Sequence, residues 1–271
     1  MQKIKGKLRW LLYRHPALYF IRFYLYKRRY NSSLLDSESY NTYNPKKDIP
    51  RIFHEVNSAL SLTSNDGLDK AIKLAKEIRL RIPGGPGLGL SSGKALEIMI
   101  QGEGGTCSDI TQAYNNFCIL NDIKIREWGI IDKLYGARFG HAFNEYYSEE
   151  LQKWVLVDIS KCIYFIHPDT NIQLSALELF DMVKINEPIE YISFLPDPGL
   201  HFNKGLDESV NHIYLHKDRL PFLISNYKIK FYDRLLNRFQ SWLPTFVIHF
   251  MAVLLFNNVK FILTRDRDDM E

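Results

Sequence analysis

Short blocks of apolar and alternating residues mark the middle of the chain as a region of β-strands. Residues 124–131, 140–147 and 153–158 each have the length and the β-branched and aromatic content typical of strands. The polar residues 148–151 separate the last two blocks by the length of a hairpin loop. We therefore expect an antiparallel arrangement here, with residues 132–140 as the loop that precedes the second strand.

The hairpin predicts which side chains share a face of the sheet. If residues 148–151 form the loop, Tyr147 lies opposite Gln152, and counting back along both strands places His141 opposite Asp158. Opposed residues share a face, with Cβ atoms roughly 4.5–5.5 Å apart. A carboxylate at that distance can accept a hydrogen bond from the imidazole, whereas a slip of one residue would send the two groups to opposite faces.

Helical spacing appears on both sides of these strands. Residues 67–80 and 174–185 carry apolar residues at helical intervals, and residues 64–66 are suited to cap the first of these helices. A further helix is expected to begin after Thr106, with Asp109 completing a capping box and a buried stripe of Ile110, Tyr114, Phe117 and Cys118. We expect the helix over 67–80 to pack beside it.

Cys107 is the first residue of that expected helix. Free amides and the positive end of the helix dipole favour a thiolate there, although Asp109 in the same turn opposes it. Gly104 and Gly105 allow the backbone to approach a substrate closely. A protonated imidazole is still needed to stabilise the sulfur anion, and His141 is the candidate. Cys107, His141 and Asp158 can thus serve as nucleophile, base and orienting carboxylate.

These motifs resemble the transglutaminase-like core over about residues 66–165. The resemblance rests on residues 92–107, on the His-Ala-Phe-Asn-Glu run at 141–145 and on the Trp-x-x-x-Asp run at 154–158. It implies that Cys107 is the nucleophile, that His141 acts first as general base and then as acid, and that Asp158 orients His141. One departure is Ile159-Ser160, where many relatives have Pro-Thr.

The resemblance also implies a fold and an activity. The fold is an α+β, papain-like core in which the nucleophile helix packs on an antiparallel sheet, with helical additions at both ends. The activity is that of a thiol-dependent amide or acyl hydrolase, or acyl transferase, which works through an acyl-enzyme without a metal or other cofactor. A peptidase or amidase is favoured over a cross-linking enzyme, with a peptide, protein or other amide-bearing substrate. The alternative is a catalytically inactive transglutaminase-like binding module at a membrane surface.

Several further residues are candidates for substrate binding. The Cys107 amide is the natural first oxyanion donor, and Gln101 has the papain-style offset for a second one. Gly105 lies in the glycine-rich approach to the cysteine. Tyr135 and Arg138 belong to the loop before His141 and are expected to meet the substrate.

The pattern divides the chain into three parts. Residues 1–49 are a basic, aromatic N-terminal segment and linker, residues 50–200 are the catalytic core, and residues 201–271 are a helical extension. Residues 1–30 contain nine Lys and Arg residues and no Asp or Glu, which favours an interfacial helix on an anionic membrane or packing against the core. Residues 242–256 are apolar but interrupted, so a spanning helix is not favoured.

Composition narrows the remaining possibilities. A net charge of +4 over 271 residues is too small to indicate nucleic-acid binding. Three cysteines, an odd number without a secretion signal, favour a reducing compartment and a free thiol, so we expect a cytoplasmic, peripherally membrane-associated protein. His212 and His216 lack a further ligand in view, and the pattern predicts no metal site.

Overall fold

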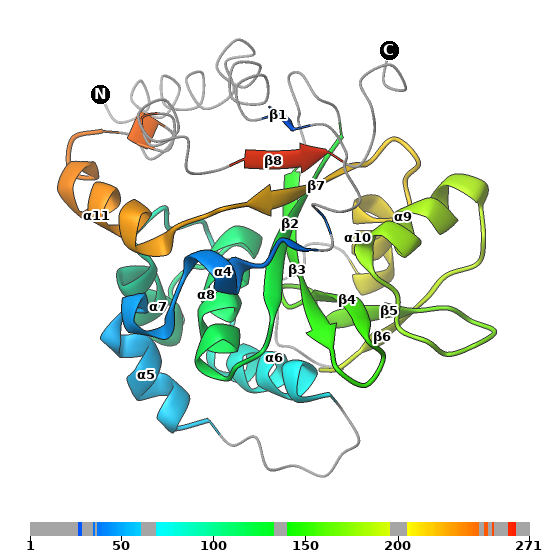
Figure 1. The fold of residues 1–271 in the computed structure, drawn as a ribbon, viewed down its shortest axis with the longest axis horizontal. Helices are drawn as coiled ribbons and strands as arrows, with labels where there is room; N and C mark the ends of the chain where they lie inside the picture. The colour runs from blue at the N-terminus through cyan, green and yellow to red at the C-terminus, as the bar shows by residue number, and fades with distance from the viewer. Residues whose placement is uncertain are drawn as a thin grey trace.

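The fold is built on one eight-stranded sheet (Figure 1). The computed structural model describes residues 37–60, 69–132, 140–195 and 205–243, together with residues 27–28, 35, 247–248, 251 and 260–263. Neighbouring strands are antiparallel except for the parallel pair at one edge, β1 and β8. The spatial order is β1 (Lys27–Arg28), β8 (Lys260–Leu263), β7 (Leu220–Ser225), β2 (Ile125–Ile131), β3 (Gly140–Ser148), β4 (Lys153–Asp158), β5 (Ile163–Ile166) and β6 (Glu190–Ser193).

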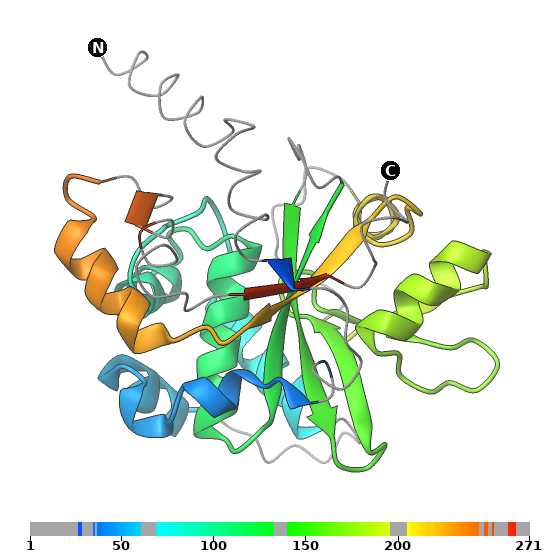
Figure 2. The same ribbon diagram turned by 45° about the horizontal axis from the view of Figure 1, so that its top comes forward.

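Helices cover both faces of this sheet, which makes the protein an α+β structure (Figure 2). One side carries α5 (Arg51–Ser58), α6 (Lys70–Arg81), α7 (Ser92–Ile100) and α8 (Cys107–Leu120). The other side carries α9 (Ala176–Ile185) and α10 (Leu206–Ile213). The short α4 (Tyr40–Tyr43), a 3-10 turn (Lys46–Asp48) and α11 (Ile229–Phe239) complete the described helices.

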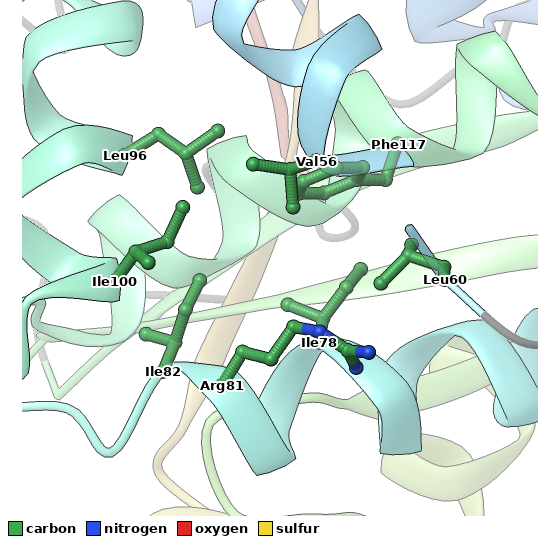
Figure 3. Close-up of a pocket in the computed structure, with 8 residues that line it drawn as sticks. All are labelled: Val56, Leu60, Ile78, Arg81, Ile82, Leu96, Ile100 and Phe117. Carbon is green, nitrogen blue, oxygen red and sulfur yellow. The ribbon is translucent and has the colours of Figure 1, made fainter. Parts of the chain in front are cut away.

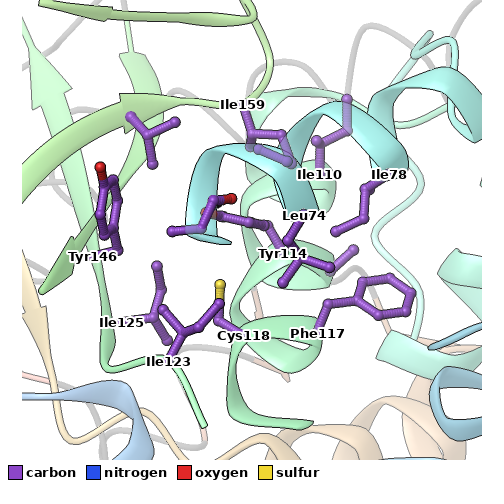
Figure 4. Close-up of a cluster of buried hydrophobic side chains, with 14 of the residues drawn as sticks. Leu74, Ile78, Ile110, Tyr114, Phe117, Cys118, Ile123, Ile125, Tyr146 and Ile159 are labelled. Atoms are coloured by element: carbon purple, nitrogen blue, oxygen red, sulfur yellow. Dashed lines mark hydrogen bonds between the residues drawn. The ribbon is translucent and has the colours of Figure 1, made fainter. Parts of the chain in front are cut away.

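The hydrophobic core on the α8 side confirms the expected stripe of the cysteine helix. Ile110, Tyr114, Phe117 and Cys118 are all buried, and Figure 4 shows them gathered with side chains from α6 and from the sheet. The Tyr114 hydroxyl donates to the carbonyl of Ala71 at 2.7 Å, which satisfies its polar end and ties α8 to α6. The predicted packing of these two helices is therefore confirmed, although α6 begins at Lys70 rather than at residue 67.

A second core lies on the opposite face of the sheet. Trp128, Phe143 and Leu156 point away from α8 and pack with residues of α9 and α10. The buried Glu145 carboxylate accepts from Arg126 Nε at 2.6 Å and from the Ala176 amide at the start of α9. This carboxylate therefore satisfies the free end of a helix while pairing with a buried guanidinium, and it anchors α9 to the sheet.

The N-terminal part of the chain differs from the expected linker. Leu35, Tyr40 and Asn44 are buried, and the Asn41 side chain accepts from the amide of Ile125 at 2.8 Å and donates to the carbonyl of Ile123 at 2.9 Å. The polar residues at 31–49 predicted a linker, but Asn41 binds the chain at the start of β2 and Asn44 binds the segment that leads into α11. Lys27 and Arg28 form a strand, so the expected interfacial helix does not include them; residues 1–26 lie outside the described part.

The C-terminal part is also not simply helical. Residues 220–225 form β7, which pairs along β2 at the centre of the sheet, and residues 260–263 form β8. The expectation of a helical extension is wrong for these residues, because short apolar runs do not by themselves distinguish a buried strand from a helix. No helix among the described residues has the length and apolar content needed to cross a membrane.

Two glycine-rich segments hold the start of α8 in place. The amide of Gly85 donates to the carbonyl of Gly105, and the amide of Gly105 donates to the carbonyl of Pro86, both at 2.9 Å. Gly104 has φ +87°, and a Cβ on it would lie 3.0 Å from the Pro86 carbonyl oxygen. Only glycine fits both this backbone conformation and this close approach, so residues 84–88 are packed against the segment that leads into α8.

We predict that Gly104→Ala destabilises the protein by about 1–3 kcal/mol more than Gly102→Ala. Both glycines have positive φ, but a Cβ on Gly102 would meet only Pro83, at 3.8 Å. Comparing the two variants therefore separates the free-energy cost of overpacking from that of backbone strain. Urea unfolding of both variants measures the difference, and equal losses in the free energy of unfolding would show that the two segments are not tightly packed.

Candidate active site

The candidate nucleophile, Cys107, lies where the capping pattern predicts it. Cys107 is the first residue of α8, and the Asp109 carboxylate accepts from the amide and the hydroxyl of Thr106, each at 2.9 Å. The same oxygen accepts from the amide of Leu88 at 3.2 Å. Asp109 therefore holds the loops that lead into the helix. Cys107 itself is half-buried, and its thiol is free, as are those of Cys118 and Cys162.

The hairpin that carries the other two groups has a register different from the expected one. Tyr147 pairs with Trp154 rather than with Gln152, and the four-residue loop comprises residues 149–152. The loop has the expected length but is displaced by one residue. Gln152 takes a positive φ of 51° within it, a conformation that the sequence pattern alone did not indicate.

This displacement shifts the pairing by two residues. The observed register, continued along both strands, places Phe143 opposite Asp158, so His141 and Asp158 are diagonal neighbours rather than directly opposed. A two-residue shift keeps both side chains on the same face. The diagonal separation of such residues, about 7–8 Å between backbones, is within reach of an imidazole and a carboxylate.

The expected contact between the base and the acid is present. His141 Nε2 lies 2.7 Å from Asp158 Oδ2, and the two side chains are 6% and 0% exposed. Because Nε2 is engaged by the carboxylate, Nδ1 is the ring nitrogen that remains for the thiol. The contact therefore determines both the tautomer and the direction in which the ring faces.

Cys107 meets His141 at an open edge of β3. The first β3 residue that pairs with β4 is Asn144, so among the described strands none pairs with the preceding residues of β3 on that side. His141 and the backbone amide of Ala142 both lie close enough to Cys107 to lower the pKa of its thiol. The three predicted residues are thus brought together where β4 departs from β3.

The electrostatics of the triad favour an ion pair. Burial raises the pKa of the Cys107 thiol, but His141 and the Ala142 amide outweigh it, so the pKa lies below its ordinary value. Burial lowers the pKa of His141, and Asp158 and Cys107 together raise it to about 10. Both directions favour a thiolate beside an imidazolium over the neutral pair.

Asp158 has more hydrogen-bond partners than the sequence indicated. Its Oδ1 accepts from the Ser160 hydroxyl at 2.8 Å and from the amide of Lys161 at 3.0 Å, and its Oδ2 accepts from the Tyr214 hydroxyl at 2.7 Å as well as from His141. Burial raises the pKa of Asp158, while His141 and these donors lower it to about 2. Ser160 belongs to the Ile159-Ser160 pair, which replaces the Pro-Thr pair of many relatives, and it serves here as a hydrogen-bond donor to Asp158. Tyr214 lies in a segment where the sequence shows no recognisable motif.

A second buried acid, Glu127 of β2, was not predicted. Its carboxylate is 3% exposed and accepts from Asn115 Nδ2 at 2.9 Å, and Asn115 in turn accepts from Asn144 Nδ2 at 2.8 Å. Burial is the main reason that the pKa of Glu127 is raised to about 8. The hydrogen bond from Asn115 opposes this shift, and the nearby Cys107 adds to it. Glu127 is therefore protonated at neutral pH and adds no negative charge beside the thiolate.

The remaining predicted residues divide into two groups. Gly105 adjoins the nucleophile loop and has φ +106°. Gln101 is the exposed residue that ends α7, and within the described part of the chain no hydrogen bond joins it to the triad. Tyr135 and Arg138 lie outside the described residues.

A shallow apolar hollow lies elsewhere on the protein. It lies between α5, α6, α7 and α8 (Figure 3) and offers about 10 Å³ of space to water-sized molecules, far below the volume usual for small-molecule sites. None of the triad residues lines it. Its lining side chains are Val56, Leu60, Ile78, Arg81, Ile82, Leu96, Ile100 and Phe117.

Comparisons of the chain with protein-family models, with curated proteins and with solved structures found no match. The likeness to the transglutaminase-like core therefore rests on the motifs and on the geometry of the three residues described above.

We predict that Glu127→Gln becomes increasingly more stable than the wild type as the pH rises from about 4.5 to about 8. The folded protein holds the Glu127 proton more tightly than the unfolded chain does, so stability is lost as pH rises through this window, with a slope of up to about 1.4 kcal/mol per pH unit. The glutamine keeps an oxygen for Asn115 and does not titrate. Urea unfolding between pH 4 and pH 9 measures the difference between the two proteins.

The matched control is Glu97→Gln, an exposed glutamate on α7. Its difference from the wild type should show no comparable rise between pH 4.5 and pH 8. A Glu127→Gln difference that stays level with pH would mean that Glu127 titrates as an ordinary surface carboxylate.

Proposed function

We propose that this protein is a thiol-dependent amide or acyl hydrolase, or acyl transferase, of transglutaminase-like type. The observation that carries the proposal is the Cys107–His141–Asp158 arrangement, in which Asp158 binds Nε2 at 2.7 Å and the pKa of Cys107 is lowered by His141. A buried thiolate–imidazolium pair costs desolvation free energy. A binding module has no need of it, whereas nucleophilic catalysis does.

The reaction begins with attack by the sulfur. The Cys107 thiolate forms a C–S bond with the carbonyl carbon, and the carbonyl oxygen takes the negative charge beside the Cys107 amide at the start of α8. His141 then transfers its Nδ1 proton to the leaving nitrogen or oxygen as the bond to that group breaks. The product of this step is a thioester on Cys107 and a neutral imidazole.

The second half of the reaction restores the thiolate. Neutral His141 removes a proton from water or from an acceptor amine, whose oxygen or nitrogen attacks the thioester carbon. The C–S bond breaks, the thiolate returns and His141 again carries the positive charge. Asp158 remains ionised throughout and stabilises the imidazolium.

Hydrolysis is favoured over cross-linking, in which the acyl group is transferred to an amine of another protein. The described strands all belong to one sheet that helices cover, and none of them forms a separate β-domain of the kind that cross-linking transglutaminases carry. A peptide, a protein or another amide-bearing compound is the substrate class that this chemistry serves.

We predict that iodoacetamide alkylates Cys107 rapidly near pH 6–7 and that His141→Ala slows the reaction at pH 7 by at least about tenfold. Without the imidazolium, burial raises the thiol pKa, and each unit of pKa reduces the thiolate fraction about tenfold. Mass spectrometry of the alkylated peptides measures the rates. Cys118 and Cys162 serve as internal references, because burial raises the pKa of both thiols.

The control variant is His54→Ala, which removes an exposed histidine from α5 and should leave the rate unchanged. Alkylation of wild-type Cys107 with the pH dependence of a free cysteine would refute the enzymatic proposal and favour the inactive binding module. Competition of candidate amides and esters with an electrophilic probe then identifies the substrate class.

A further inference from the structure

Tyr214 lies against the acid and the base of the triad. It follows α10 directly, and its side chain is fully buried. Its hydroxyl donates to the same Asp158 oxygen that binds His141, at 2.7 Å. Its ring meets the His141 ring edge-on, with centroids 5.9 Å apart.

Aromatic neighbours fix the position of this tyrosine. Its ring contacts Phe143 of β3, Phe165 of β5 and Phe180 of α9 at centroid distances of 5.8, 4.9 and 6.4 Å. These rings exclude water from one side of the His141–Asp158 contact. A hydrogen bond to a charged group is stronger where water cannot compete for the donor and acceptor.

The segment that carries Tyr214 is held in place on both sides, by α10 before it and by β7 after it. Val210 and Ile213 of α10 are buried in the second core, and the Arg219 guanidinium donates to the carbonyl of His212 at the end of the helix. The chain then enters β7, which pairs with β2. The tyrosine thus has little freedom to leave Asp158.

We propose that Tyr214 is a positioning residue of the active site, which holds the Asp158 carboxylate so that His141 presents Nδ1 to Cys107. The inference rests on the proposed function and deepens it. It also places an essential part of the site outside residues 66–165, to which the transglutaminase-like resemblance is confined. A transglutaminase-like core that ended before α10 would hold the triad without this fourth group.

The charged and titratable groups around this contact come from three elements and from the residue that follows α10. Cys107 belongs to α8, His141 to β3 and Asp158 to β4, and Tyr214 directly follows α10; Glu127 of β2 lies near Cys107. Burial, Asp158 and Cys107 all raise the pKa of Tyr214 well above its ordinary value, so its hydroxyl remains a donor over the working pH range. Removing that hydroxyl frees one side of Asp158 and lets the imidazole turn away from the sulfur.

The test is the pH profile of Cys107 alkylation in full-length Tyr214→Phe. We expect the acid limb to move up by about one pH unit and the rate near pH 6 to fall about tenfold, in line with the loss of a hydrogen bond to a charged group. In an Asp158→Asn background the same change should alter the rate less than about twofold, because its partner is already lost.

The matched control is Tyr146→Phe. Tyr146 is a buried tyrosine whose hydroxyl donates to the Asp69 carboxylate at 2.9 Å, on the other face of the sheet. It should lower stability without moving the acid limb, as any purely structural tyrosine would. Urea unfolding of every variant confirms that folded protein is compared.

The outcomes separate the two proposals. A normal fast profile for the wild type, together with an unchanged profile for Tyr214→Phe, overturns the role of Tyr214 and leaves the triad intact. A wild-type profile like that of a free cysteine overturns both. An equal effect of Tyr214→Phe in the wild-type and Asp158→Asn backgrounds would show that the tyrosine does not act through Asp158.

Discussion

The buried negative charge of Asp158 is the constraint on which the site depends. A carboxylate without exposure to water is unstable unless it is paired and hydrogen-bonded, and here the donors come from β3, from the turn after β4 and from α10. Satisfying this one group therefore ties three separate parts of the chain together. Asp158 raises the pKa of His141, and His141 in turn lowers the pKa of the Cys107 thiol, so the buried carboxylate acts on the sulfur through the ring between them.

A second buried acid in the same region, Glu127, favours the neutral form, whereas Asp158 favours the ionised form. Glu127 accepts a bond from a neutral amide rather than from a cation, and its pKa is raised to about 8 while that of Asp158 is lowered to about 2. Environments that separate two pKa values in this way are typical of sites that assign distinct roles to two acids. Because its pKa is raised, Glu127 favours the neutral form and adds little negative charge near Cys107.

The architecture explains why the three groups meet. The start of α8 is positioned by paired glycine segments and by Asp109, and the open edge of β3 lies where β4 departs. The Ala142 amide of β3 lies near this edge and lowers the pKa of the Cys107 thiol. The break in strand pairing between β3 and β4 is thus where the start of α8 brings Cys107 beside His141.

The sequence by itself determined the local features of this site, and the tertiary structure decided how they combine. The capping box at Thr106, the buried stripe of α8 and the strand at 153–158 follow from periodicity and side-chain chemistry, which act over a few residues. The shared face of His141 and Asp158 was predictable too, because side chains alternate between the two faces of a sheet and a shift of two residues leaves each on the same face. The pairing of Tyr147 with Trp154, the strand at 220–225 and the contacts of Tyr214 and Glu127 depend on segments distant in the chain. Only packing in three dimensions supplies the partners that make those buried polar groups stable.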